Sequence, residues 1–409
     1  MRKQTRHWLA VLLCNLACGR HPLWGQTPNA PPGIDITRPG DAAFAGALAA
    51  FQEADRALIA GYTLERAGDL AGARPKLDAA TAGFQSARTR FDAFASTWCS
   101  PGRSIRCDHA AYLAGRSSFE LGKLLTNASE WLDAIARLEK MEGAYPASFF
   151  LHEAIYFDGR AHYDLRDWTP ARLKLTRAIE VAAAGRYADA AQQHIGTSYY
   201  QEGLALVSVI PRPTPGSANY LPALAAFDAA ERELSKVLSG YPAGRYLESA
   251  RYYLGKTAYE RPWDSSTARI ANLNTALTWF DRVLDAPVPI HAMGAHYWRG
   301  RCHYALASEI ASLSALDPAE LATALTEFKV VSPPDSHADH ALYYIAKVYV
   351  HTQPPVCTGG SDPAPASICG AYATLKMLVA SSAVYAASTY PLKTQTYVQA
   401  HLPSCLCPW

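Results

Sequence analysis

The amino-acid sequence predicts an all-α protein in which helical hairpins stack side by side as an α-solenoid. Three observations favour this class: a helical pattern that recurs six times, an alanine-rich composition with spaced aromatic residues, and prolines that separate the copies. The chain has 409 residues, of which 49% are apolar, so it is long enough to bury a large core. We expect about six or seven hairpins, because one hairpin cannot bury its apolar faces alone.

The recurring pattern describes the first helix of each hairpin. Four segments align without gaps, with proline in second place, alanine eight residues later, and glycine or alanine five residues after that. Two further segments share only the second half of the pattern. In chain order the six segments are 110–119, 145–163, 190–200, 241–259, 286–304 and 332–350.

The second helix of each hairpin is marked by alanine four residues before phenylalanine. This spacing puts a small and a large apolar residue on one helical face, where the first helix can pack. Proline then ends the hairpin because it cannot continue a helix. The pairs are Ala223 and Phe227, Ala276 and Phe280, and Ala324 and Phe328.

These motifs resemble tetratricopeptide repeats. They are more closely similar to the exported subtype found in the Tol-Pal-associated periplasmic coordinator and in the outer-membrane assembly lipoprotein. The segment "YPAGRYLESARYYLGKTAY" (241–259) carries the Tyr-Pro start, the spacer, the alanine and the aromatic pair before Leu-Gly that this subtype favours. The resemblance covers about 100–350, with insertions at 211–220 and 353–370. It implies a scaffold without cofactors, whose partners are other proteins of the cell envelope.

The N-terminus is typical of an export signal. Arg2, Lys3 and Arg6 precede an apolar run from Leu9 to Cys18 that is too short to anchor the chain in a bilayer. Two cleavage routes stay open: ordinary signal cleavage, or lipidation of Cys18. The predicted organisation is 1–25 signal peptide, 26–40 Pro-rich linker, 41–108 N-terminal hairpin and cysteine loop, 109–352 repeats, 353–370 cysteine-bracketed loop, and 371–409 C-terminal capping helices and cysteine tail.

Cysteine spacing also indicates an oxidising compartment, periplasmic or associated with the outer membrane. Cys99 and Cys107 bracket one short loop rich in turn formers, and Cys357 and Cys369 bracket another, so each pair is a predicted disulfide. The pairing of Cys405 and Cys407 in the tail stays open. We expect no metal site there, because no second ligand pair with zinc-like spacing stands nearby.

The candidate binding residues come from the repeats themselves. In five of six copies a tyrosine stands three residues before the glycine or alanine of the pattern, and a cation comes directly after that glycine or alanine. The two are four residues apart and therefore share a helix face. The resemblance implies that this face lines a concave groove, where it would bind an anionic peptide tail or acidic polymer. The alternative is a solvated face, or ion pairs with acids such as Glu120, Asp158 or Glu260. The pairs are Tyr112 and Arg116, Tyr156 and Arg160, Tyr252 and Lys256, Tyr297 and Arg301, and Tyr343 and Lys347.

Other function classes have weaker support. A formal net charge of +2 disfavours a general nucleic-acid binder. His296 and His303 could bind a metal only with help from another element. Asp158, Asp164 and Asp167 suggest an all-α carbohydrate-active enzyme as the runner-up, since paired carboxylates hydrolyse glycosides. The sequence therefore favours a non-enzymatic exported scaffold that binds protein partners.

Overall fold

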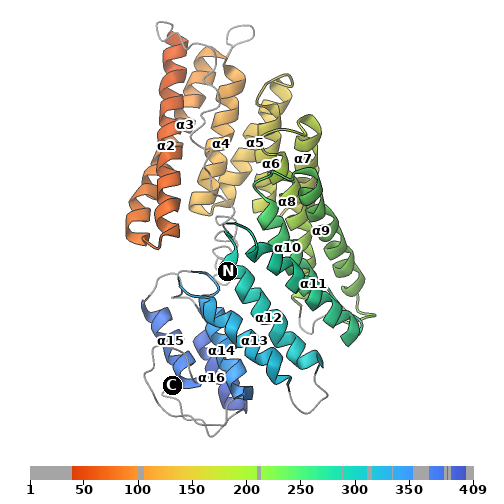
Figure 1. The fold of residues 1–409 in the computed structure, drawn as a ribbon. Helices are drawn as coiled ribbons and strands as arrows, with labels where there is room; N and C mark the ends of the chain where they lie inside the picture. The colour runs from red at the N-terminus through yellow and green to blue at the C-terminus, as the bar shows by residue number, and fades with distance from the viewer. Residues whose placement is uncertain are drawn as a thin grey trace. The chain divides into compact units, whose positions relative to one another are not determined.

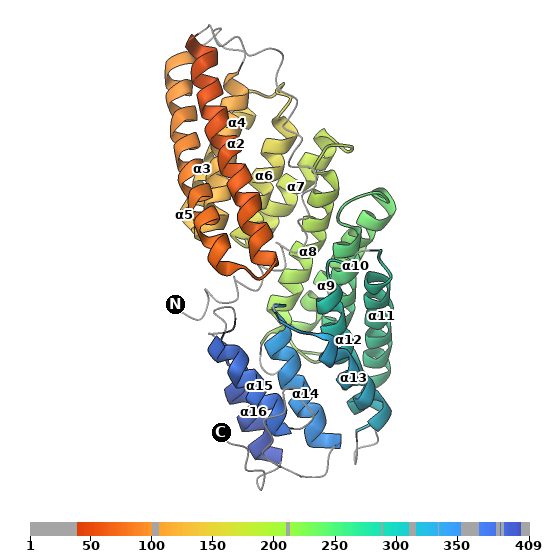
Figure 2. The same ribbon diagram turned by 60° about the vertical axis from the view of Figure 1, so that its left-hand side comes forward.

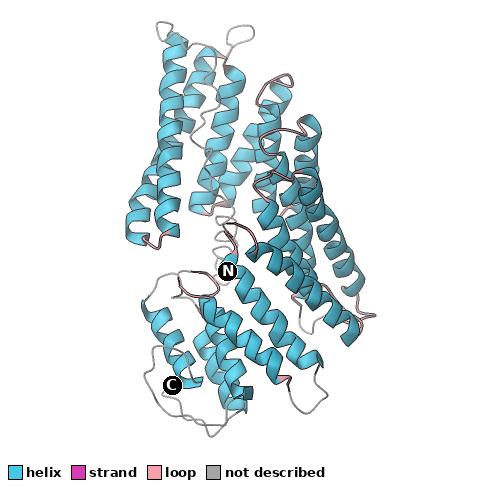
Figure 3. Cartoon of the chain, in the orientation of Figure 1, coloured by secondary structure: helices cyan, strands magenta, loops and turns pink. Residues whose placement is uncertain are grey.

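The protein is an all-α chain built from helical hairpins. The computed structural model describes residues 39–99, 106–209, 213–287, 289–310, 316–333, 335–352, 368–381, 385 and 388–401. Within these ranges every regular element is a helix and no strand occurs (Figure 3). The predicted fold class is confirmed. Among the helices described, none combines the length and hydrophobicity that a membrane crossing needs.

Two compact units make up the described chain. The N-terminal unit contains the described residues up to 202 together with 232–246, and the C-terminal unit contains 203–231 and those from 247 onward. Short turns connect consecutive helices, which places them antiparallel. The N-terminal unit has α2 (Pro39–Arg66), α3 (Leu70–Trp98), α4 (Cys107–Leu125), α5 (Ala128–Ala144), α6 (Leu151–Asp164), α7 (Trp168–Val181) and most of α8 (Ala188–Val207) (Figure 1).

The C-terminal unit continues the same alternation of first and second helices. The helix α9 (Tyr220–Gly240) contributes its first part to this unit and its last part to the N-terminal unit. The remaining helices are α10 (Leu247–Glu260), α11 (Ser266–Leu284), α12 (Ala292–Ile310), α13 (Pro318–Val330), α14 (Ala338–Thr352), α15 (Ile368–Ser381) and α16 (Tyr390–His401) (Figure 2).

Glycine on the first helices α4, α6, α8, α10 and α12 lets the second helix approach closely, whereas α14 has Ala346 at this position. A Cβ atom added to Gly159 would lie 2.9 Å from Leu175 Cγ on α7, and one added to Gly300 would lie 2.7 Å from the Phe328 ring on α13. The alanine–phenylalanine spacing thus positions the ring that fills the space left by the glycine. The same contact joins Gly115 to Leu138, Gly196 to Leu234, and Gly255 to Phe280.

The register of α9 differs from the sequence expectation. Leu234, seven residues after Phe227, faces Gly196 within the N-terminal unit. Phe227 itself lies 3.1 Å from the Cβ position of Gly203, within the C-terminal unit. The helix therefore carries two small-and-large pairs, Ala223 with Phe227 and Ala230 with Leu234, and the sequence comparison identified only the first.

An aromatic ladder joins consecutive hairpins. Each ring of the ladder stands four positions before the alanine of the repeat pattern. It packs on the tyrosine of the tyrosine–cation pair in the preceding repeat. The rings are stacked in the first three pairs and tilted in the fourth, and their centroids are separated by favourable distances. They are 5.3 Å for Tyr112 and Phe150, 4.5 Å for Tyr156 and Tyr187, 4.7 Å for Tyr252 and His291, and 4.8 Å for Tyr297 and His337.

Acidic residues in the first turn of a first helix fix the register of the next repeat. Asp189 accepts a hydrogen bond of 2.9 Å from the Arg245 backbone N–H, and Glu248 accepts one of 2.6 Å from the His291 backbone N–H. Each bond satisfies a donor in the turn before the following first helix. The repeats are thus held by side chain to backbone bonds as well as by apolar packing.

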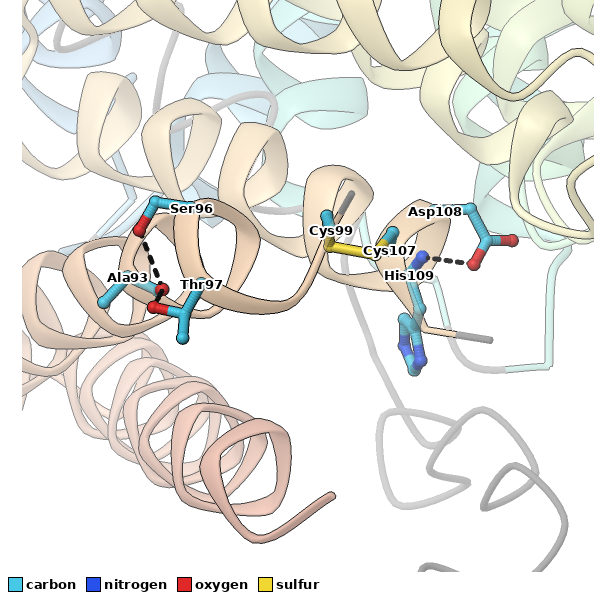
Figure 4. The surroundings of a disulfide bond; sticks show 7 residues. All are labelled: Ala93, Ser96, Thr97, Cys99, Cys107, Asp108 and His109. Carbon is cyan, nitrogen blue, oxygen red and sulfur yellow. Dashed lines mark hydrogen bonds between the residues drawn. A yellow bond between two sulfur atoms is a disulfide. The ribbon is translucent and has the colours of Figure 1, made fainter. Parts of the chain in front are cut away.

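One predicted disulfide lies within the described residues. Cys99 directly follows α3 and Cys107 begins α4, and their Cα atoms are 5.6 Å apart, an ordinary separation for a disulfide (Figure 4). Cys369, which lies within the described residues, is also disulfide-bonded. The other half of the second predicted pair, Cys357, lies outside them, as do the signal segment with Cys18 and the tail with Cys405 and Cys407.

Candidate functional site

The tyrosines of the five predicted pairs are mostly packing residues. Tyr112, Tyr156, Tyr252 and Tyr297 are buried between first helices, where the aromatic ladder covers them. Tyr343 is the one tyrosine of the five pairs that is half-buried. Among the cations, Arg116 is just 5% exposed, and the others are half-buried: Arg160, Lys256, Arg301 and Lys347. Groove binding by these pairs stays a prediction, and the structure limits its accessible part to the half-buried members.

In the N-terminal unit the first cation has acidic neighbours. Arg116 Nη2 lies 3.8 Å from Asp55 Oδ1 on α2, and Arg116 Nε lies 4.0 Å from Glu120 Oε1 one turn along α4. The rings of Phe51 and Phe157 also contact its guanidinium, at 5.2 and 5.0 Å from their centroids. Burial raises the pKa of Asp55 to about 7, although Arg116 opposes that shift.

Two further cations of this unit, Lys123 and Arg160, also have carboxylate neighbours. Lys123 Nζ lies 3.1 Å from Glu120 Oε2. Burial alone would lower the pKa of Lys123, but the charge and hydrogen bond of Glu120 together with Tyr62 raise it above its ordinary value. Arg160 Nη2 lies 3.5 Å from Asp164 Oδ1, and the guanidinium also contacts the His194 ring. The ion-pair alternative thus describes the N-terminal unit, with Asp164 in place of the expected Asp158.

Asp158 belongs to a separate network. Its carboxylate, Glu139 and His162 bring ligand atoms within 4.8 Å of one another, the composition of a possible cation site. The Lys174 ammonium occupies that position, 2.5 Å from Asp158 Oδ2 and 3.3 Å from Glu139 Oε1. Burial raises the pKa of Asp158 to about 7, with Lys174 opposing the shift. A lysine charge therefore already neutralises this cluster.

The acids that suggested glycoside hydrolysis are each engaged by a base. Asp158 contacts Lys174, Asp164 contacts Arg160, and Asp167 Oδ2 lies 3.2 Å from His162 Nδ1. Within the described residues these acids therefore do not offer a pair of carboxylates to a substrate. The structure gives the runner-up function no support at these three positions.

Arg301 in the C-terminal unit is surrounded by rings rather than by acids. Its Cζ lies 4.5 Å from the ring centroids of both Tyr259 and Trp298 and 5.8 Å from that of Tyr344. The nearest described carboxylate oxygen, on Glu260, is 4.0 Å from Nη1, the outer limit of an ion pair. Arg301 Nε is buried and has no hydrogen-bond partner among the described residues.

Lys347 has an even more aromatic environment. Its Nζ lies 4.7 to 5.6 Å from four tyrosine centroids, and no described carboxylate forms an ion pair with it. Burial, with a smaller contribution from the nearby Arg301 charge, lowers the pKa of Lys347 to about 8. The four rings belong to Tyr304, Tyr343, Tyr344 and Tyr397.

The sequence contains a signal for the different surroundings of these cations that the repeat pattern alone did not reveal. The residue four positions after the cation is acidic in the first three tyrosine–cation pairs and is not acidic in the last two. Arg301 is followed at that spacing by Ala305 and Lys347 by His351, so neither can pair along its own helix. The acids at the earlier copies are Glu120, Asp164 and Glu260.

The two histidines of the fifth copy have structural partners. His296 Nδ1 lies 2.7 Å from Glu327 Oε2, and His303 Nδ1 lies 2.6 Å from Glu320 Oε2. Both glutamates stand on α13, the second helix of the same hairpin. These side chains therefore bind α12 to α13 and do not converge on a shared ligand.

The N-terminal unit contains a pocket of about 610 Å³, a size common for small-ligand sites. It lies among α3, α4 and α5 beside the disulfide, and alanines form much of its lining. The charged Arg137 at its edge is neutralised by Asp92 and Asp133, at 2.6 and 2.7 Å. Lys140 also lines the pocket, so two acidic and two basic side chains stand in its wall.

Comparisons with known proteins add little about function. No protein-family model matches the chain, and no curated protein does. Among solved structures, the chain is similar to a monomeric mutant of IFIT1 with m7Gppp-AAAA, at 12% identity and a TM-score of 0.40. That similarity covers 84% of this chain and 80% of that one. The helical-repeat assignment rests on the hairpins of this chain itself.

Proposed function

We propose that this chain is a non-enzymatic, exported repeat scaffold that binds acidic segments of partner proteins. The binding surface is the half-buried cluster on α12, α14 and α16, here named the tyrosine–cation surface. The observation that carries the proposal is that Lys347 contacts tyrosine rings and has no ion pair with a described carboxylate, and that the ion-pair neighbour of Arg301 among the described residues, Glu260, is 4.0 Å away. The counterparts in the N-terminal unit, Arg116 and Arg160, have carboxylates at 3.8 and 3.5 Å in addition to their ring contacts. The surface comprises Arg301, Tyr304, Tyr343, Tyr344, Lys347 and Tyr397.

The residue types at this surface suit protein recognition. Tyrosine and arginine are enriched among the residues that dominate binding energy at interfaces, because both give large contact area together with polar groups. A half-buried cation without a carboxylate partner has lost part of its hydration, so an incoming anion gains more there than at a fully solvated lysine. Charge and ring faces together favour an acidic peptide.

The cell envelope is the proposed location. The export signal predicted at 1–25 and the resemblance to envelope repeat proteins support it. The bonded cysteines Cys99, Cys107 and Cys369 are consistent with an oxidising compartment. The role we propose is assembly or maintenance of the envelope, with membrane attachment only through a lipid on Cys18.

The test is capture of partners from envelope extracts of the native host. The wild-type chain is compared with Arg301→Glu/Lys347→Glu, and with a control that reverses the exposed Lys76 and Arg74 of α3. We expect the first variant to lose the captured proteins and the control to keep them. Equal capture by all three would contradict the proposal.

A further inference from the structure

We infer that the ligand group of the tyrosine–cation surface is a carboxylate of an acidic peptide, bound where Arg301 and Lys347 lie against the ring of Tyr344. This inference rests on the proposed function and names the chemistry that the surface recognises. The two charged groups lie 5.8 and 5.2 Å from the Tyr344 centroid, so one short peptide segment can contact both.

Arg301 has hydrogen-bonding capacity to spare. Its side chain is 22% exposed, and its ion-pair neighbour among the described residues, Glu260, is 4.0 Å away, which is too far for a hydrogen bond. A carboxylate that approaches the exposed part of the guanidinium can accept charge-assisted N–H bonds at hydrogen-bond distance, which Glu260 does not.

Lys347 supplies the second charge on a neighbouring first helix. No described carboxylate neutralises it, and the adjacent Arg301 charge adds repulsion. Binding an anion between or beside these two cations removes that repulsion. The tyrosine faces around Lys347 can meanwhile pack against the aliphatic part of a glutamate or aspartate side chain.

The surroundings favour a carboxylate over a phosphate. Both cations stand inside helices, at position 301 of Ala292–Ile310 and position 347 of Ala338–Thr352, so their backbone N–H groups are already bonded. Phosphate sites in proteins usually add backbone N–H groups from a helix N-terminus or a glycine-rich loop. Two separate side-chain cations suit singly charged carboxylates.

The experiment measures binding of fluorescein-labelled peptides by anisotropy with the full chain. One peptide alternates glutamate with glycine, a second has glutamine in place of glutamate, and both have amidated C-termini. A third is the glutamine peptide with a free C-terminal carboxylate. We expect the glutamate peptide to bind at least about tenfold tighter than its amidated glutamine match, a difference of about 1.4 kcal/mol. The third peptide shows whether a terminal carboxylate suffices.

Variants locate the binding to this surface. We expect Lys347→Gln and Arg301→Gln each to weaken glutamate-peptide binding about tenfold, Lys347→Arg to preserve it, and the control Lys76→Gln to leave it unchanged. Circular dichroism checks that each variant is folded. Equal affinity for the glutamate and glutamine peptides would overturn the inference. So would inorganic phosphate displacing a bound peptide more effectively than acetate.

The two proposals can fail separately. If peptide binding shows no carboxylate preference while partner capture still depends on Arg301 and Lys347, the scaffold function stands and the ligand chemistry is wrong. If capture is also independent of both residues, the scaffold function at this surface is wrong as well.

Discussion

The same repeat position has different surroundings in the two units. All four cations contact aromatic rings. In the N-terminal unit Arg116 and Arg160 also have carboxylates at 3.8 and 3.5 Å, whereas in the C-terminal unit Arg301 has one at 4.0 Å and Lys347 has no ion pair with a described carboxylate. The pattern of tyrosine and cation is identical in the sequence. A repeated motif can therefore serve packing in one part of an array and leave charge available for a ligand in another.

The largest expected effect is the loss of a matched cation in the N-terminal unit. Arg116→Leu leaves Asp55 buried without its ion-pair partner and leaves Glu120 paired with Lys123 alone, which should cost about 3–5 kcal/mol. Lys347→Leu removes no ion pair and should cost only about 1 kcal/mol from lost ring contacts. Urea unfolding of the full chain measures both. A similar loss of unfolding free energy in the two variants would contradict the claim that Arg116 and Lys347 have different surroundings.

The next effect concerns the free energy of unfolding at low pH, because the aromatic ladder of the C-terminal unit contains histidine rings. His291 occupies the position of Phe150 and Tyr187, and burial lowers its pKa to about 4, below the ordinary 6.5. A folded-state pKa below the unfolded value means that stability is lost as pH falls from 6.5 towards 4.

His291→Phe should remove this loss. At about 1.4 kcal/mol per pKa unit, the wild-type chain should lose about 3 kcal/mol more than the variant between pH 7 and pH 4. Unfolding midpoints at the two pH values provide the measurement. The charged or titrating groups near His291 are Lys256, His337 and Asp335, with Glu248 on its backbone N–H. Parallel pH curves for wild type and variant would contradict this explanation.

A smaller effect should be the same in both units, because close approach at the glycine is common to them. Gly159→Ala and Gly300→Ala each place a Cβ within 3.0 Å of the second helix and should cost about 1–3 kcal/mol. Gly143→Ala is the control, since nothing lies within 4 Å of the added atom. The control should gain up to about 1 kcal/mol of helix stability. A gain at all three positions would show that the glycines do not determine the packing.

Local periodicity made the hairpins and their glycine contacts predictable from the sequence, and the Cys99–Cys107 disulfide followed from loop length. The register of α9 was harder, since Phe227 and Leu234 both follow an alanine at the same spacing. The neutralisation of Arg116 by Asp55 was not visible, because Asp55 comes from a helix about 60 residues earlier and meets Arg116 only through tertiary packing.

The most direct test of the account compares the reactivity of two lysines. Lys123 and Lys347 are both half-buried on first helices, but Glu120 raises the pKa of Lys123, whereas burial lowers that of Lys347 to about 8. Only the neutral amine reacts with an acylating reagent. Limited acetylation at pH 8 followed by mass spectrometry should modify Lys347 more than about tenfold faster than Lys123. Equal rates, or faster modification of Lys123, would contradict the claim that Lys347 has no carboxylate partner among the described residues whereas Lys123 has one.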